Sequence, residues 1–279
     1  HRALAAGQHD LVEVLLELGA DASRANAHGW RPADVAALED ADDLAQRLVA
    51  ASGVAVQAQR IAYFRALREG DVAALNAALD EGVAIETPDP KGRTGLMIAV
   101  ADDHEELVEC LLARGADVAA RRGEQGESCV LREASSAAMR RRLLEAGAPA
   151  SYRDAKGVLR QPALEAVIAE DDHALLDLVL GPRVRGLALS DLSALHSSLV
   201  WGDYEARLDA RAEALRRLGA AGADLVARAD DGAPLLCGYI RRGFDLPAIA
   251  VIEAGTDLEA SDRNLVTPLL QCCECYSDH

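Results

Sequence analysis

Apolar residues along this chain fall into short stripes at helical spacing, and a glycine closes each stripe. The spacing i, i+1, i+4, i+5 predicts amphipathic helices that bury their apolar side. A glycine at the helix end fits a left-handed cap, where a Cβ atom would cost energy. Two stripes show the spacing most clearly: Leu11, Val12, Leu15 and Leu16, and Leu107, Val108, Leu111 and Leu112.

The stripes recur with a period near 33 residues. The closing glycines stand at 19, 53, 82, 115, 147, 181, 222 and 255, so successive differences are 34, 29, 33, 32, 34, 41 and 33. A fixed period of this length is the signature of a repeat architecture, in which each unit buries its apolar face against its neighbours. We therefore expect one repeat array.

A second phrase precedes many of the stripes and resembles Thr-Pro-Leu-His. Thr267-Pro268-Leu269-Leu270 keeps most of it, and Arg31-Pro32, Thr94-Gly95-Leu96 and Ser193-Ala194-Leu195-His196 keep parts. Together with the period, this phrase resembles the ankyrin repeat along the whole chain. The resemblance implies an all-α repeat fold: an ankyrin-type solenoid of stacked helix-turn-helix layers, with short β-hairpin or loop fingers between repeats.

The predicted domain is a single ankyrin-repeat array over residues 1–279. Both ends are expected to fall inside repeats of a longer chain. The predicted segments are a partial repeat at 1–25, repeats at about 26–58, 59–88, 89–122, 123–153, 154–187, 188–228 and 229–261, and a partial repeat at 262–279.

Two places break the period. Near 52–63 the glycine spacing shortens and no finger phrase is present, so we expect a missing finger there. This stretch is either a junction between two stacked arrays, 1–58 and 59–279, or a single degenerate repeat within one continuous stack. We favour the single stack. Residues 203–211 lengthen another repeat by about two helical turns, which a longer second helix or inter-helix loop can absorb.

Composition narrows the possible partners. Hydrophobic residues make up 50% of the chain and aromatic residues only 3%, as expected for thin Ala/Leu/Val layers. The formal net charge of −17 repels phosphate backbones, which argues against nucleic acid. No apolar run is long enough to cross a bilayer, so we expect no membrane partner. Lysine occurs only at 91 and 156, which together with the alanine excess suggests a bacterial, GC-rich genome.

The six cysteines lack the spacing of a disulfide framework, so a cytoplasmic protein is expected. Secretion from a bacterium into a host cytosol would leave the same pattern. Cys272, Cys275 and His279 would share a face of an unbroken helix and are weak candidates for zinc ligands. We favour the simpler interpretation, in which Cys272 and Cys273 are small buried residues and no metal is bound.

No catalytic residues are predicted, and no cofactor. The sequence Asp-Asp-His occurs at 102–104 and again at 171–173. An aspartate beside a histidine resembles the carboxylate–imidazole pairs of acid–base catalysis. Both lie at the turn between two helices, where aspartate commonly caps the second helix. Phosphate-binding, nucleophile-elbow and zinc-protease signatures do not occur in the sequence.

The fingers carry the residues expected to contact a partner. Trp30 follows a finger glycine, and it either packs on the adjacent finger or anchors a partner, since Trp, Tyr and Arg dominate binding hot spots. The candidate partner-binding residues are Trp30, Arg121, Arg122, Tyr152, Arg153 and Arg183.

The sequence therefore predicts a non-catalytic scaffold that presents fingers and first-helix residues to a protein partner. The alternative is the targeting portion of a bacterial enzyme or host-directed effector whose catalytic domain lies outside this sequence.

Overall fold

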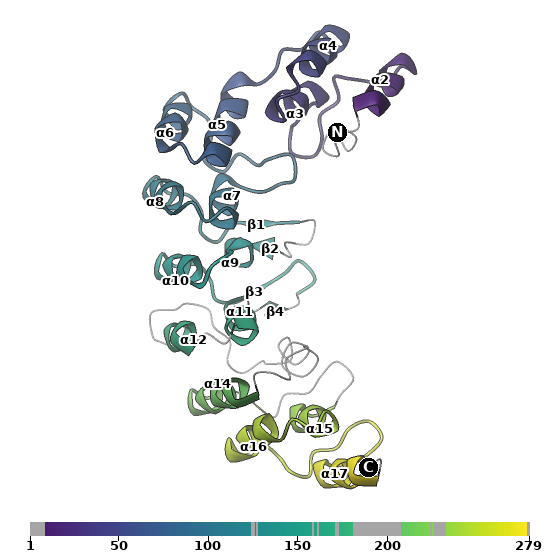
Figure 1. Cartoon of the computed structure of the whole chain (residues 1–279), viewed down its shortest axis with the longest axis vertical. Coiled ribbons are helices and arrows are strands. Elements are labelled where there is room, and N and C mark those ends of the chain that lie inside the picture. Colours follow the sequence, from purple (N-terminus) through teal and green to yellow (C-terminus); the bar gives the residue numbers. More distant parts are fainter. Residues whose placement is uncertain are drawn as a thin grey trace. The chain divides into compact units, whose positions relative to one another are not determined.

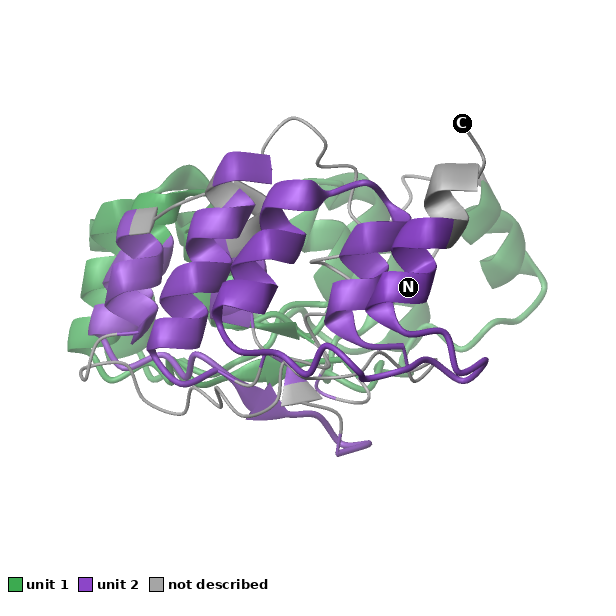
Figure 2. Ribbon diagram, turned by 90° about the horizontal axis from the view of Figure 1, so that it is seen from below, with its two compact units in different colours: residues 1–124, 128–139 green, residues 125–127, 140–279 purple. Residues whose placement is uncertain are grey.

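The structure is a computed structural model of the chain, and it divides into two compact units. The first unit comprises residues 1–124 and 128–139, and the second comprises 125–127 and 140–279, coloured separately in Figure 2. The residues that the structure describes are 9–123, 126, 128–157, 159–160, 162–170, 173–180, 208–223, 225 and 233–277.

The first unit is built from pairs of short helices, which Figure 1 shows layer by layer. Helices of equivalent position stack on one another, α3 on α5 and α5 on α7, with α6 on α8. Its elements are α2 (His9–Glu17), α3 (Pro32–Leu38), α4 (Asp42–Ser52), α5 (Ala58–Glu69), α6 (Val72–Asp80), α7 (Gly95–Ala101), α8 (Glu105–Ala113), β1 (Arg121–Arg122), β2 (Ser128–Cys129) and α9 (Val130–Glu133).

Helix α10 (Ala137–Glu145) begins in the first unit and continues into the second. In the second unit α14 packs on α16, α15 packs on α16, and α17 packs on α15. The elements of this unit are β3 (Tyr152–Arg153), β4 (Leu159–Arg160), α11 (Pro162–Glu170), α12 (His173–Leu180), α14 (Leu208–Ala220), α15 (Leu235–Arg241), α16 (Asp245–Glu253) and α17 (Pro268–Ser277).

The two-residue strands form antiparallel hairpins. In the first unit β1 pairs with β2, and in the second β3 pairs with β4. Figure 2 shows the loops and the hairpin of the second unit along one side of its helices. The predicted fold class is therefore confirmed: helix pairs joined by short hairpin or loop fingers.

Local sequence explains where the helices begin and end. Pro32 opens α3, where its missing N–H has no partner to lose, and the Thr94 hydroxyl accepts from the Met97 N–H at the start of α7. The recurring glycines lie in the left-handed region just after the second helices, as predicted, at 19, 53, 82, 115, 147, 222 and 255, whereas Gly181 lies outside the described residues.

The predicted apolar stripe is confirmed in α8 for Leu107, Val108 and Leu111, which are fully buried, whereas Leu112 is half-buried. In α2 the prediction is wrong for Leu11 and Leu15, which are 47% and 43% exposed. Leu15 instead lines a hollow that it shares with Pro32 and Leu48, so its side chain stays open to solvent.

Aspartate capping of the second helices is confirmed in one repeat and wrong in another. The Asp71 carboxylate accepts from the Ala74 N–H, 2.9 Å away, and so caps α6. At the start of α8 the N-cap is His104, which makes no side-chain cap. Asp103 instead adopts the left-handed conformation (φ 58°) at the inter-helix turn and accepts from the Ser136 hydroxyl. Asp171 and Asp172 lie outside the described residues.

The two places where the repeat period breaks also differ from the regular repeats in the structure. Helix α4 ends at Ser52 and α5 begins at Ala58, so residues 53–57 join them without a finger. The stretches on either side belong to one compact unit. In the lengthened repeat, α14 has 13 residues against 9 in α8, so at least part of the insertion extends the second helix.

Gly95 stands where the ankyrin phrase has proline, and tertiary packing explains the glycine. A Cβ atom built on Gly95 would lie 2.0 Å from the Tyr63 hydroxyl of α5. That hydroxyl donates to the Ile85 carbonyl oxygen at 3.1 Å, and burial raises the pKa of Tyr63 above its usual value. The tyrosine therefore occupies the space that a side chain at position 95 would need.

We expect Gly95→Ala to lower the free energy of unfolding by about 1–3 kcal/mol, because overpacking forces Tyr63 or the backbone of α7 to move. Chemical denaturation followed by circular dichroism measures the loss. In a Tyr63→Phe background the loss should be smaller, since the atom closest to the new Cβ is gone. An equal loss in both backgrounds would show that Tyr63 is not the cause.

Candidate functional site

Two fingers of the first unit are turns that are each held by one polar side chain. The Asn26 Oδ1 accepts from the backbone N–H of His28 and Trp30 at 2.9 and 3.0 Å. Asp89 repeats the arrangement, with its Oδ1 2.8 Å from the N–H of both Lys91 and Arg93. Each tip is therefore fixed by internal hydrogen bonds and does not depend on a ligand.

The second unit uses the same turn. Asp154 accepts from the Lys156 N–H at 2.9 Å, and Asp262 accepts from the N–H of Asn264 and Val266 at 2.8 and 3.0 Å. Position four of the turn is left-handed, and Leu265 (φ 61°) holds the place that glycine takes in the other fingers. The phrase Asn/Asp-x-x-Gly locates the tips at Asn26, Asp89 and Asp154 from sequence, but not the tip at Asp262.

Trp30 is fully buried, so the interpretation that it anchors a partner is wrong and the packing interpretation is confirmed. Its Nε1–H donates to the Pro88 carbonyl oxygen at 2.8 Å. The indole centroid lies 5.4 Å from that of Phe64, and the Arg60 guanidinium carbon lies 4.1 Å from the indole centroid. The tryptophan thus joins its own finger to α5 and to the next finger.

Arg60 takes the place of the missing finger. Its Nη2 donates to the carbonyl oxygens of His28 at 2.8 Å and Pro88 at 2.7 Å, one on each neighbouring finger. Burial lowers the pKa of the Arg60 guanidinium, and the negative charges of Asp34 and Asp89 partly oppose this. Nothing in the local sequence around Arg60 indicates this role, because its partners come from two distant loops.

Asp34 adds a buried carboxylate next to the contacts that Trp30 and Arg60 make between the two fingers and α5. Its carboxylate is fully buried and accepts from the backbone and side-chain N–H groups of both Arg31 and Gln57, at 2.9–3.1 Å. Residues 53–57, which lack a finger, are thereby tied to the start of α3. Sequence reasoning missed Asp34 as well.

A hollow of about 490 Å³ lies between the first helices and the fingers of the first unit. Its apolar lining comes from α3, α5, α7 and one finger, and charged residues surround it. We call this hollow the groove. It is lined by Asn26, Val35, Leu38, Glu39, Phe64, Arg68, Asp89, Pro90, Lys91, Arg93, Ile98 and Asp102.

Most positive charges around the groove are already paired. The Arg93 Nε lies 2.9 Å from Asp89 Oδ2, and Arg68 donates to the Leu38 carbonyl and to Asp40. Glu39 and Asp102 are exposed, and neither has a side-chain partner among the described residues. The groove therefore combines an apolar lining with carboxylates that are free to bind a cationic group.

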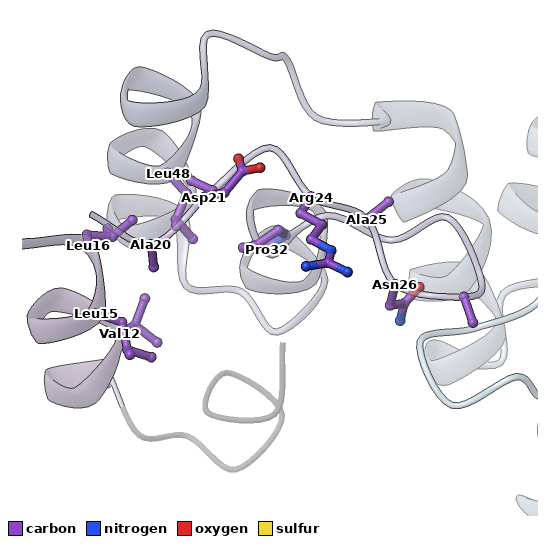
Figure 3. A pocket seen from close by; sticks show the side chains of 12 residues that line it. Val12, Leu15, Leu16, Ala20, Asp21, Arg24, Ala25, Asn26, Pro32 and Leu48 are labelled. Carbon is purple, nitrogen blue, oxygen red and sulfur yellow. The ribbon is translucent and has the colours of Figure 1, made fainter. Parts of the chain in front are cut away.

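A second hollow of about 460 Å³ lies between α2 and the α3–α4 layer. Figure 3 shows Val12, Leu15 and Leu16 of α2 on one side of it, with Leu48 and Pro32 beyond. Its lining is largely apolar, so it is a gap between helical layers with little chemistry for recognising a ligand.

The predicted arginine pair at 121–122 lies on the β1 strand. Arg121 is exposed. Arg122 is half-buried, with its Nε 2.8 Å from Glu133 Oε1. Only Arg121 of this pair therefore keeps a largely exposed side chain.

In the second unit, Tyr152 is 6% exposed, so the interpretation of it as an exposed contact is wrong. It lies on β3 opposite Arg160. Its neighbour Arg153 is exposed and donates from Nη1 to the Gly157 carbonyl oxygen at 2.9 Å. Arg183 lies outside the described residues.

The cysteines of α17 differ from expectation. Cys272 and Cys273 are exposed, not buried, because Pro268 and Gln271 form the buried face of α17. His279 and the side chain of Cys275 lie outside the described residues, so the structure does not test them as metal ligands. Within the described ranges no three metal-ligating side chains come together.

The described part of the chain contains no helix with the length and apolar character needed to cross a membrane.

The comparisons with known proteins agree with this architecture. The ankyrin repeat family model matches residues 91–122, which include α7 and α8. An ankyrin repeat-containing protein of Treponema pallidum (strain Nichols) is 28% identical over 120 residues, 42% of this chain and 39% of that relative. The chain thus matches well under half of the relative's length.

A solved structure with a TM-score above 0.5 shares the fold. The human ASB11 ankyrin repeat domain has a TM-score of 0.54 and 18% identity, covering 74% of this chain and 89% of that one. An ankyrin repeat domain from Acinetobacter baumannii AYE gives a TM-score of 0.39 at 15% identity, covering 92% and 97%. With its helix pairs, its fixed finger turns and its glycine-closed second helices, this chain has the ankyrin-repeat fold, and its residues 91–122 match the ankyrin repeat family model.

Proposed function

We propose that the chain is a non-catalytic scaffold that binds a protein partner through its fingers and the exposed edges of its first helices. Ankyrin repeats are generally protein–protein interaction modules and typically non-catalytic. The observation that carries the proposal is the groove of the first unit, an open hollow of about 490 Å³ with rigid finger tips along it.

The division of work between the helices supports the same surface. The apolar side of α8 is fully buried, so it is committed to packing between layers. The finger tips, in contrast, hold their conformation with their own side chains and leave Lys91 exposed. A partner can therefore contact the fingers without any layer separating.

The alternative, the targeting portion of a bacterial enzyme or host-directed effector, stays a hypothesis. It assigns the same binding role to this segment and adds a catalytic domain elsewhere. The full-length reading frame of the gene separates the two.

We expect Arg121→Ala and Arg153→Ala to weaken partner binding by about 1–3 kcal/mol, the range of interface anchors. A partner is first captured from a lysate of the source organism, and its affinity for each variant is then measured by calorimetry. Glu109→Ala, on the second helix α8, is the control and should bind like wild type. Loss of binding in Glu109→Ala alone would place the partner on the opposite surface.

A further inference from the structure

From the groove of the first unit, we infer the chemistry of the partner segment: a peptide with a large apolar side chain next to Arg or Lys. This inference rests on the proposed function and specifies it further. It follows from two independent features of the groove, its apolar lining and the charges at the ends of the helices beside it.

The lining fits an apolar side chain. Val35, Phe64 and Ile98 come from three successive first helices and line one hollow of about 490 Å³. They are at most 7% exposed, so each presents only a small apolar surface to the hollow. A leucine or aromatic side chain of a partner would cover these three surfaces together and displace water from them.

The helix ends beside the groove are negatively charged. The C-terminal end of a helix carries a partial negative charge, which favours Lys or Arg there. Helices α3 and α7 have no basic residue in their last turn and are capped instead by Glu39 and Asp102. The two carboxylates therefore add to the negative potential of the helix ends.

The arginines near these two carboxylates are paired with other carboxylates, and Lys91 is the remaining basic residue of the groove lining. Arg65 and Arg68 both lie within 2.8 Å of Asp40, and Ser136 donates to Asp103. Glu39 and Asp102 have no such partner in the described part of the chain. A cationic side chain of the partner would meet both the carboxylates and the helix ends, so charge complementarity selects a basic peptide over an acidic one.

The test uses a random peptide library displayed on phage and selected on the whole chain at low salt. We expect the selected peptides to be enriched in Arg or Lys beside Leu, Phe or Trp. The double variant Glu39→Gln, Asp102→Asn should bind a selected peptide about tenfold more weakly, and added salt should remove most of this difference.

The matched control is Glu17→Gln with Glu81→Gln. It removes the same number of charges from the C-terminal ends of two second helices, α2 and α6, and should bind like wild type. Selected peptides that are acidic, or that bind both double variants equally, would overturn the inference and leave the scaffold function standing. Retained binding of the captured protein partner by Arg121→Ala and Arg153→Ala would instead overturn the scaffold proposal itself.

Discussion

Replacing Trp30 by alanine should lower the free energy of unfolding by about 3–5 kcal/mol, the range for a large buried aromatic residue. The side chain is fully buried, donates to Pro88 and packs against Phe64 and Arg60. Its removal leaves a cavity at the point where two fingers and α5 meet. Urea denaturation followed by far-ultraviolet circular dichroism measures the loss.

Two control substitutions test whether the loss of stability in Trp30→Ala comes from the buried indole. Trp30→Phe keeps an aromatic ring but loses the N–H, so it should destabilise less than alanine. Lys91→Ala removes an exposed side chain from the neighbouring finger and should change stability by no more than about 0.5 kcal/mol. If Trp30→Ala unfolded at the same urea concentration as wild type, the indole would not be part of the core.

Asp34→Ala is the second substitution with a large expected effect, again about 3–5 kcal/mol, because it leaves a buried charged and polar cluster without its acceptor. The carboxylate is 0% exposed and accepts from the backbone N–H and side chain of both Arg31 and Gln57. Without it, the connection between α4 and α5 loses its attachment to α3.

An exposed ion pair of the same unit provides the comparison for Asp34. Asp80 lies 2.8 Å from Arg114 at the surface, so Asp80→Ala should cost less than about 1 kcal/mol in the same denaturation experiment. Asp34→Asn keeps one acceptor oxygen and should fall between the two. Equal losses for Asp34→Ala and Asp80→Ala would contradict the structural role given to the buried carboxylate.

Much of the local structure could be predicted from the sequence. Glycine after each second helix, proline at the start of α3 and the apolar stripe of α8 all depend on short-range rules: backbone conformation, missing N–H groups and helical periodicity. The missing finger at 52–63 was also predictable, because a finger needs residues that the chain lacks there. These features depend on neighbours within a few positions.

The candidate site was harder to predict for the opposite reason. Trp30 resembles an exposed finger residue in its local phrase, but it is covered by Arg60 and by the finger at 85–93. Similarly, Cys272 and Cys273 occupy positions that are usually buried, but both are exposed on α17, which packs against α15. Burial of a single side chain depends on segments from elsewhere in the chain.

The sequence by itself thus determined the repeat period, the helix pairs, the finger turns and the net negative charge. Only the tertiary structure decided that Arg60 fills the place of a finger, that Tyr63 requires a glycine at position 95, and that Glu39 and Asp102 border one groove. The physical reason is that the pattern of apolar residues fixes which face of a helix is buried. The contacts made there depend on which distant side chains occupy the remaining space.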